Sequence, residues 1–84
     1  MTVVDLYSKE DCHLCETAKE IITRIRLTHF FEFNIIQLHE RHELFEELKD
    51  RIPVVYINHE FAFQYRVPEA AFIQKIRGKS SDEH

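Results

Sequence analysis

Apolar positions change their spacing several times along the chain, and each change predicts a new element. Residues 2–7 are apolar and β-branched, which predicts a first strand. Residues 13–27 place apolar side chains three and four positions apart, as on the inner stripe of an amphipathic helix. This stripe consists of Leu14, Ala18, Ile21, Ile22 and Ile25.

The middle of the chain repeats this order. The segment from Phe30 to Leu38 is rich in Phe and Ile, which predicts a strand packed on both sides. Helical spacing returns from Glu40 to Lys49, with glutamates on the outer face. The inner face of this second helix is expected to contain Arg41, Leu44, Phe45 and Leu48.

Two further strands are expected around a short turn. Residues 53–57 and 60–65 flank Asn58-His59, which predicts a hairpin even without the usual turn glycine. Because alternate residues of a strand face one side, the row formed by Phe61, Phe63 and Tyr65 is expected to form a core face. The alternative is an exposed row that binds a partner.

A third helix is expected near the end of the chain. Pro68 at its first position, Glu69 in its first turn and Gly78 past its end frame this helix. Its inner face is expected to contain Ala71, Ile76 and either Phe72 or Ile73. Residues 79–84 are polar and are expected to be a disordered tail, which leaves a domain of residues 1–78.

The predicted order of elements is β-α-β-α-β-β-α. A βαβ unit crosses over right-handedly to a parallel strand, whereas strands joined by a tight turn pair antiparallel. The expected fold is therefore α/β, with a four-stranded mixed sheet and helices on both faces.

Length and charge exclude several classes of function. The 84 residues fit one small domain, since typical domains have roughly 100–150 residues. Eleven Lys and Arg against 15 Asp and Glu give a net charge of −4 with interspersed signs, so nucleic acid is not an expected partner. No apolar run approaches the roughly 20 residues that span a bilayer, so no membrane partner is expected. The short polar ends favour a monomer.

The cysteines point to a redox site. The first residues show no leader pattern, which favours the reducing cytosol. In that compartment the two cysteines of Cys12-His13-Leu14-Cys15 are not expected to form a permanent structural disulfide. They lie where the first strand ends and the first helix begins. Residues that are three positions apart on a helix have Cα atoms roughly 5–6 Å apart, a distance that a disulfide tolerates.

The two cysteines are expected to play different roles. Cys12, near the helix N-cap, faces unpaired N–H groups and the positive end of the helix dipole, which favour the thiolate. Cys15 lies one turn further in and is expected to be more buried. We therefore predict a reversible dithiol with Cys12 as the nucleophile and Cys15 as the resolving thiol.

The sequence leaves other interpretations open. Cys12 and Cys15, with His13, His39 and His42, are the residue types of a zinc or iron–sulfur site, but their spacing is not that of a zinc finger, and we expect no metal. A non-catalytic module that binds a partner beside Pro53 would need no thiol chemistry.

Asp5 lies on a strand that is expected to be buried on both faces. A buried carboxylate near a dithiol can accept the proton of the resolving thiol. More often such a carboxylate pairs with a cation, here for example Arg24.

Three short motifs occur together in this chain. Tyr7-Ser8-Lys9 precedes the Cys-x-x-Cys segment at a helix start, and Arg51-Ile52-Pro53-Val54 opens the third strand. Together these motifs resemble the glutaredoxins of the thioredoxin-fold superfamily, and the Cys-His-Leu-Cys segment looks closest to a short glutaredoxin-like branch. The resemblance extends through residue 77.

This resemblance implies a thiol–disulfide oxidoreductase with Cys12 and Cys15 as catalytic residues and Pro53 in the cis form facing them. It implies protein or glutathione disulfides as partners, glutathione as a co-substrate with no bound cofactor, and glutathione or a thioredoxin reductase as electron donor. The substrate-binding residues that it implies are Lys9, His13, Arg51, Ile52 and Pro53.

One stretch departs from the glutathione-binding members of that family. Those proteins usually carry a Gly-Gly pair after the hairpin and a small residue followed by Asp at the start of the last helix. Residues 61–69 contain no glycine here, so side chains obstruct a close backbone approach. Lys9 and Arg51 would still recognise a carboxylate, and His13 replaces the usual Pro after the first cysteine.

Overall fold

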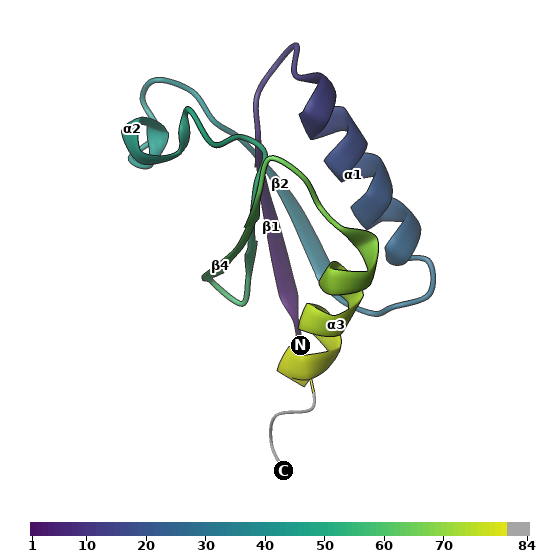
Figure 1. Ribbon diagram of the computed structural model, residues 1–84. Helices are drawn as coiled ribbons and strands as arrows, with labels where there is room; N and C mark the ends of the chain where they lie inside the picture. The colour runs from purple at the N-terminus through teal and green to yellow at the C-terminus, as the bar shows by residue number, and fades with distance from the viewer. Residues whose placement is uncertain (81–84) are drawn as a thin grey trace.

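The computed structural model describes residues 1–80 and confirms the predicted order of elements (Figure 1). The elements are β1 (Val3–Ser8), α1 (His13–Ile25), β2 (Glu32–Gln37), α2 (Phe45–Leu48), β3 (Val54–Ile57), β4 (Glu60–Gln64) and α3 (Glu69–Ser80). The four strands form one sheet in the order β2-β1-β3-β4. β1 pairs parallel with β2 and antiparallel with β3, and β3 pairs antiparallel with β4. The predicted mixed sheet is therefore confirmed.

The helices lie on both sides of this sheet. α1 and α3 cover one face, and the short α2 lies on the other side (Figure 1). The main core fills the space between the sheet and the two longer helices, where Val4, Leu6, Ile22 and Phe72 have no exposed surface. Burial of this apolar face drives the packing of the helices against the sheet.

The prediction that residues 30–38 form a strand packed on both sides is wrong. β2 is an edge strand, Ile35 is 46% exposed, and Phe30 lies before the strand with 85% of its surface exposed. A run of Phe and Ile is typical of a central strand that is covered on both faces. β2 instead lies at the edge of the sheet, where only one strand pairs with it and more of its surface meets solvent. In this chain the two central positions of the sheet belong to β1 and β3.

The predicted hairpin is confirmed. Asn58 and His59 have φ values of 51° and 68°, and positive φ at both central residues is the requirement of a type I′ turn. The Asn58 side-chain oxygen accepts the Val3 N–H at 2.9 Å, and the Asn58 N–H donates to the Val3 carbonyl at 2.8 Å. The turn is thus fixed to the start of β1.

The prediction of one core face for Phe61, Phe63 and Tyr65 is wrong because the pairing of β3 with β4 contains an irregularity. Phe61 pairs with Tyr56, but Phe63 pairs with Val55, so one extra residue lies between them in β4. Partners share a face and adjacent strand residues alternate, so Phe61 and Phe63 point to opposite faces. Phe63 packs against the main core, whereas Phe61 is 44% exposed.

The second helix is shorter than predicted, because residues 40–44 form turns. The ring nitrogens Nδ1 of His39 and His42 accept the backbone N–H groups of Arg41 and Leu44 at 3.2 and 3.0 Å. Side chains that bind nearby backbone groups compete with helix formation. α2 consequently has only the four residues Phe45–Leu48.

The last helix continues further than predicted. Gly78 lies inside α3, which extends to Ser80, and residues 81–84 of the predicted tail lie outside the described residues. Phe72 and Ile76 are buried and Ile73 is partly buried, whereas Ala71 is exposed, which corrects its predicted place on the inner face. Pro68 precedes the helix, and its carbonyl accepts the Phe72 N–H at 2.9 Å.

Candidate active site

The two cysteines occupy the start of α1 as predicted. Asp11 has a φ of 54°, a left-handed conformation that Asp tolerates better than most residues, and Cys12 follows it as the N-cap of the helix. Cys12 and Cys15 form a disulfide, and their Cα atoms lie 5.2 Å apart. The Cys12 Sγ accepts the Cys15 N–H at 3.2 Å. The sulfur of Cys12 is therefore held against the unpaired N–H groups of the first helical turn.

The two cysteines differ in exposure. Cys15 is 2% exposed, whereas Cys12 is only partly buried. Both belong to a second apolar cluster, on the side of α2, which we call the active-site cluster. Its buried members besides Cys15 are Leu38, Leu48, Ile52 and Val54, and Tyr7, Leu44, Phe45 and Tyr56 pack against it. Cys12 is thus partly accessible to solvent, while Cys15 is enclosed.

The segment before β3 lies against the disulfide. Ile52 and Val54 belong to the active-site cluster, Pro53 between them is fully buried, and the Ile52–Pro53 peptide bond is cis, as the resemblance implied. Within residues 1–80 the backbone N–H and C=O of Ile52 make no hydrogen bond. Both groups remain available to a chain that lies alongside them.

Tyr65 supports the segment before β3, a role that the sequence did not indicate. Its N–H donates to the Pro53 carbonyl at 2.8 Å, and its hydroxyl donates to the Asp50 carbonyl at 3.1 Å. Tyr65 has a φ of 67°, which a tyrosine rarely adopts. No motif in the sequence indicates such a conformation, because it depends on the path of the chain after β4.

Among the residues predicted to bind substrate, Arg51 differs from Lys9 and His13 in its contacts. Arg51 is fixed, because its Nε donates to the Gln64 side-chain oxygen at 2.8 Å and its guanidinium lies 5.2 Å from the centre of the Phe61 ring. Lys9 and His13 are exposed. Arg51 therefore faces β4, whereas Lys9 and His13 belong to the segment that carries the cysteines.

Asp5 is on the sheet face opposite the main core. Its Oδ1 accepts the Asn34 side-chain N–H at 3.0 Å, and its Oδ2 lies 4.0 Å from the Nδ1 of His59. Arg24, considered above as a partner, instead forms an ion pair with Glu69 at 2.8 Å. The contacts of Asp5 thus join β1 to β2 and to the hairpin turn.

Tyr7 lies on the same sheet face as Asp5 and packs against the active-site cluster. Its ring packs edge-on against His42 and Tyr56, with centroid distances of 5.8 and 5.6 Å. Burial raises the pKa of the Tyr7 hydroxyl above its usual value, and the nearby Asp5 carboxylate, Tyr56 and Glu43 raise this pKa further. The folded state therefore favours the neutral phenol.

This raised pKa predicts a loss of stability in alkaline solution. A group whose pKa is higher in the folded state stabilises the fold below its unfolded pKa, about 10 for Tyr, and this contribution is lost as pH rises through the folded pKa. Tyr7→Phe keeps the ring and removes the titration, so its melting temperature should fall less between about pH 9 and pH 11 than that of the wild type. Thermal unfolding of the disulfide form measures this difference. Equal slopes for Tyr7→Phe and the wild type would contradict the prediction.

Among residues 1–80 no group of three or more His, Cys, Asp or Glu side chains is arranged to hold a metal ion, so His39 and His42 do not join the cysteines there. None of the helices in the same range has the length and apolar character needed to cross a membrane.

The chain matches a known protein-family model. The model described as Glutaredoxin-like domain (DUF836) matches residues 3–77, a range that includes every strand, both cysteines and the Ile52–Pro53 segment. The four-stranded mixed sheet and three helices described above are consistent with the thioredoxin-like fold of such domains. On this match over most of its length, the chain belongs to the glutaredoxin-like domain family.

Proposed function

We propose that this protein is a thiol–disulfide oxidoreductase that uses Cys12 as the nucleophile and Cys15 as the resolving thiol. The observation that carries the proposal is the place of Cys12, a partly exposed residue at the N-cap of α1 whose sulfur is bonded to that of the buried Cys15. The helix N-terminus stabilises negative charge on that sulfur, and the thiolate is the reactive form of a cysteine.

The reaction starts from the reduced dithiol. The Cys12 thiolate attacks one sulfur of a substrate disulfide, the substrate's other sulfur leaves as a thiolate that takes up a proton, and a mixed disulfide to Cys12 forms. Cys15 then loses its proton and attacks the Cys12 sulfur, which releases the substrate's first sulfur as a thiol. The substrate gains two electrons, and the protein is left with the Cys12–Cys15 disulfide. A thiol reductant, either glutathione or a thioredoxin reductase, must restore the dithiol.

The segment before β3 suits an extended substrate. The free N–H and C=O of Ile52 lie beside the disulfide and can pair with the backbone of a chain that approaches Cys12. Lys9 and His13 are exposed at the same end of the molecule and can meet a carboxylate of the substrate. We therefore expect protein disulfides as substrates, held by backbone pairing and oriented by charge.

A reductase assay tests this proposal. The purified protein is given 2-hydroxyethyl disulfide with glutathione and glutathione reductase, and separately with a thioredoxin reductase, while consumption of NADPH is followed. Cys12→Ser should abolish the reduction that exceeds the background rate, because the remaining cysteine, Cys15, is buried. A wild-type rate equal to that of Cys12→Ser in both assays would refute the function and leave a binding module as the better interpretation.

A further inference from the structure

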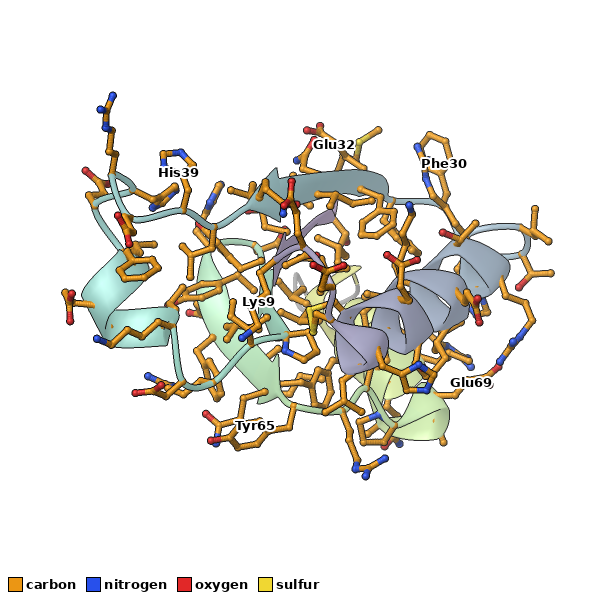
Figure 2. All side chains as sticks on the ribbon, turned by 90° about the horizontal axis from the view of Figure 1, so that it is seen from above. Lys9, Phe30, Glu32, His39, Tyr65 and Glu69 are labelled. Carbon is orange, nitrogen blue, oxygen red and sulfur yellow. A yellow bond between two sulfur atoms is a disulfide. The ribbon has the colours of Figure 1, made fainter. Side chains whose placement is uncertain are left out.

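A groove runs along α1 next to the active-site cysteines. One wall consists of residues on α1, and the other is the segment between β4 and α3. The groove has a volume of about 260 Å³ and is lined by Leu14, Thr17, Ala18, Ile21, Tyr65, Arg66, Val67 and Pro68. Figure 2 shows Tyr65 and Glu69, which bracket the second wall, on the side of the molecule where β4 leads into α3.

Both walls of this groove are tied to the disulfide site. Leu14 lies between the two cysteines in the sequence, so the first wall begins at the Cys-x-x-Cys turn. Tyr65 begins the second wall, and its N–H holds the Pro53 carbonyl at 2.8 Å. A chain that pairs with Ile52 and presents a disulfide to Cys12 therefore has the groove within reach of its neighbouring side chains.

The chemistry of the walls selects an apolar occupant. Most of the lining is aliphatic, and the polar side-chain groups are limited to the Thr17 and Tyr65 hydroxyls and the Arg66 guanidinium. The Tyr65 hydroxyl already donates to the Asp50 carbonyl. A charged amino-acid group would lose its hydration against these mainly aliphatic walls, which is unfavourable. Burial of an apolar side chain in the same place is favourable.

The size of the groove points in the same direction. Pockets for small molecules usually have volumes of about 300–1,000 Å³, and this groove of about 260 Å³ is smaller. That space suits one bulky side chain better than a whole tripeptide such as glutathione. Val67 and Pro68 line the second wall, so side chains of this chain limit the space of the groove.

We infer that this groove is a specificity pocket, which takes a bulky apolar side chain that neighbours the reacting cysteine of a protein substrate. This inference rests on the proposed function and adds a substrate class to it: protein disulfides with a flanking Leu, Ile, Met or Phe. The residues that set the preference line the groove and are not the cysteines.

A matched pair of variants tests the pocket. Thr17→Trp fills the groove from an exposed position of α1, and Thr23→Trp makes the same change at an exposed position of the same helix that does not line the groove. The substrates are two disulfide-linked peptides that differ only in a Leu or a Ser next to the cysteine. Reduction of 2-hydroxyethyl disulfide, which carries no side chain, reports the thiol chemistry alone.

The wild type and Thr23→Trp should reduce the Leu peptide with a kcat/KM roughly tenfold higher than that of the Ser peptide, which is the scale of discrimination by an apolar pocket. In Thr17→Trp this ratio should fall to about one, and because both peptides are compared within one variant, the ratio does not depend on how the substitution affects the thiol chemistry itself. A ratio near one in the wild type would overturn the pocket and leave the oxidoreductase function intact.

A binding measurement keeps the inference testable if no reduction is found. The Leu peptide with Ser in place of its cysteine cannot react, and it should shift the NMR signals of Ile21 and Val67 in the wild type but not in Thr17→Trp. Absence of these shifts would overturn the pocket independently of the assays of Cys12. Their presence in a protein without reductase activity would support the groove and refute the oxidoreductase function alone.

Discussion

Phe72→Ala is expected to lower the free energy of unfolding by about 3–5 kcal/mol. Phe72 has no exposed surface, and its ring packs against Phe31 and Phe63 with centroid distances of 5.9 and 6.3 Å. Truncation removes these contacts and leaves a cavity between α3 and the sheet. Small domains have unfolding free energies of about 5–15 kcal/mol, so this one change would remove a large share of the stability.

Equilibrium denaturation in urea, with the disulfide intact, measures this loss. Phe30→Ala is the matched control, because Phe30 is 85% exposed and its truncation should change the unfolding free energy by no more than about 0.5 kcal/mol. Similar losses for the two variants would mean that α3 is not packed on the sheet as described.

Cys15→Ser is expected to stop the proposed reaction at the mixed disulfide. The variant keeps Cys12 at the N-cap of α1, so the first attack still occurs, but the buried thiol that would attack the Cys12 sulfur is gone. With a peptide disulfide and no added thiol, the wild type should release both peptide halves and end as the internal disulfide. The variant should release one half and keep the other bound to Cys12.

Mass spectrometry of the intact protein after the reaction distinguishes these products. Nearly all of the Cys15→Ser protein should carry one peptide adduct, which a reductant removes. Cys12→Ser is the control and should form adducts far more slowly, because its remaining sulfur is 2% exposed. Faster adduct formation in Cys12→Ser than in Cys15→Ser would reverse the roles assigned to the two cysteines.

The sequence predicts the order of elements and the place of the cysteines because both depend on local patterns. The stripe from Leu14 to Ile25 indicates where α1 packs, and the same periodicity places Cys12 at its start and Cys15 one turn inside. The positive φ values of Asn58 and His59 complete a turn that two flanking apolar runs had already indicated. In each of these cases neighbouring residues carry the information.

The features that the sequence did not predict depend on contacts between distant segments. The extra residue in β4 shifts the pairing after Phe61, so the plain alternation of Phe61 and Phe63 is misleading. The imidazoles of His39 and His42 take backbone N–H groups away from a helix that the spacing of Leu44 and Leu48 would otherwise favour. The edge position of β2 follows from the strand order, which no single segment encodes.

The shifted pairing in β4 has a consequence for how recognition can change. Gln64 holds the Arg51 guanidinium, and Gln64 lies beyond the extra residue, opposite Val54. The extra residue of β4 therefore sets the direction of the Arg51 guanidinium, which lies next to the Ile52–Pro53 segment. An insertion or deletion in the hairpin would re-aim this group and leave both sulfur atoms where they are, so under the proposed function the contacts to a substrate could change without moving the dithiol.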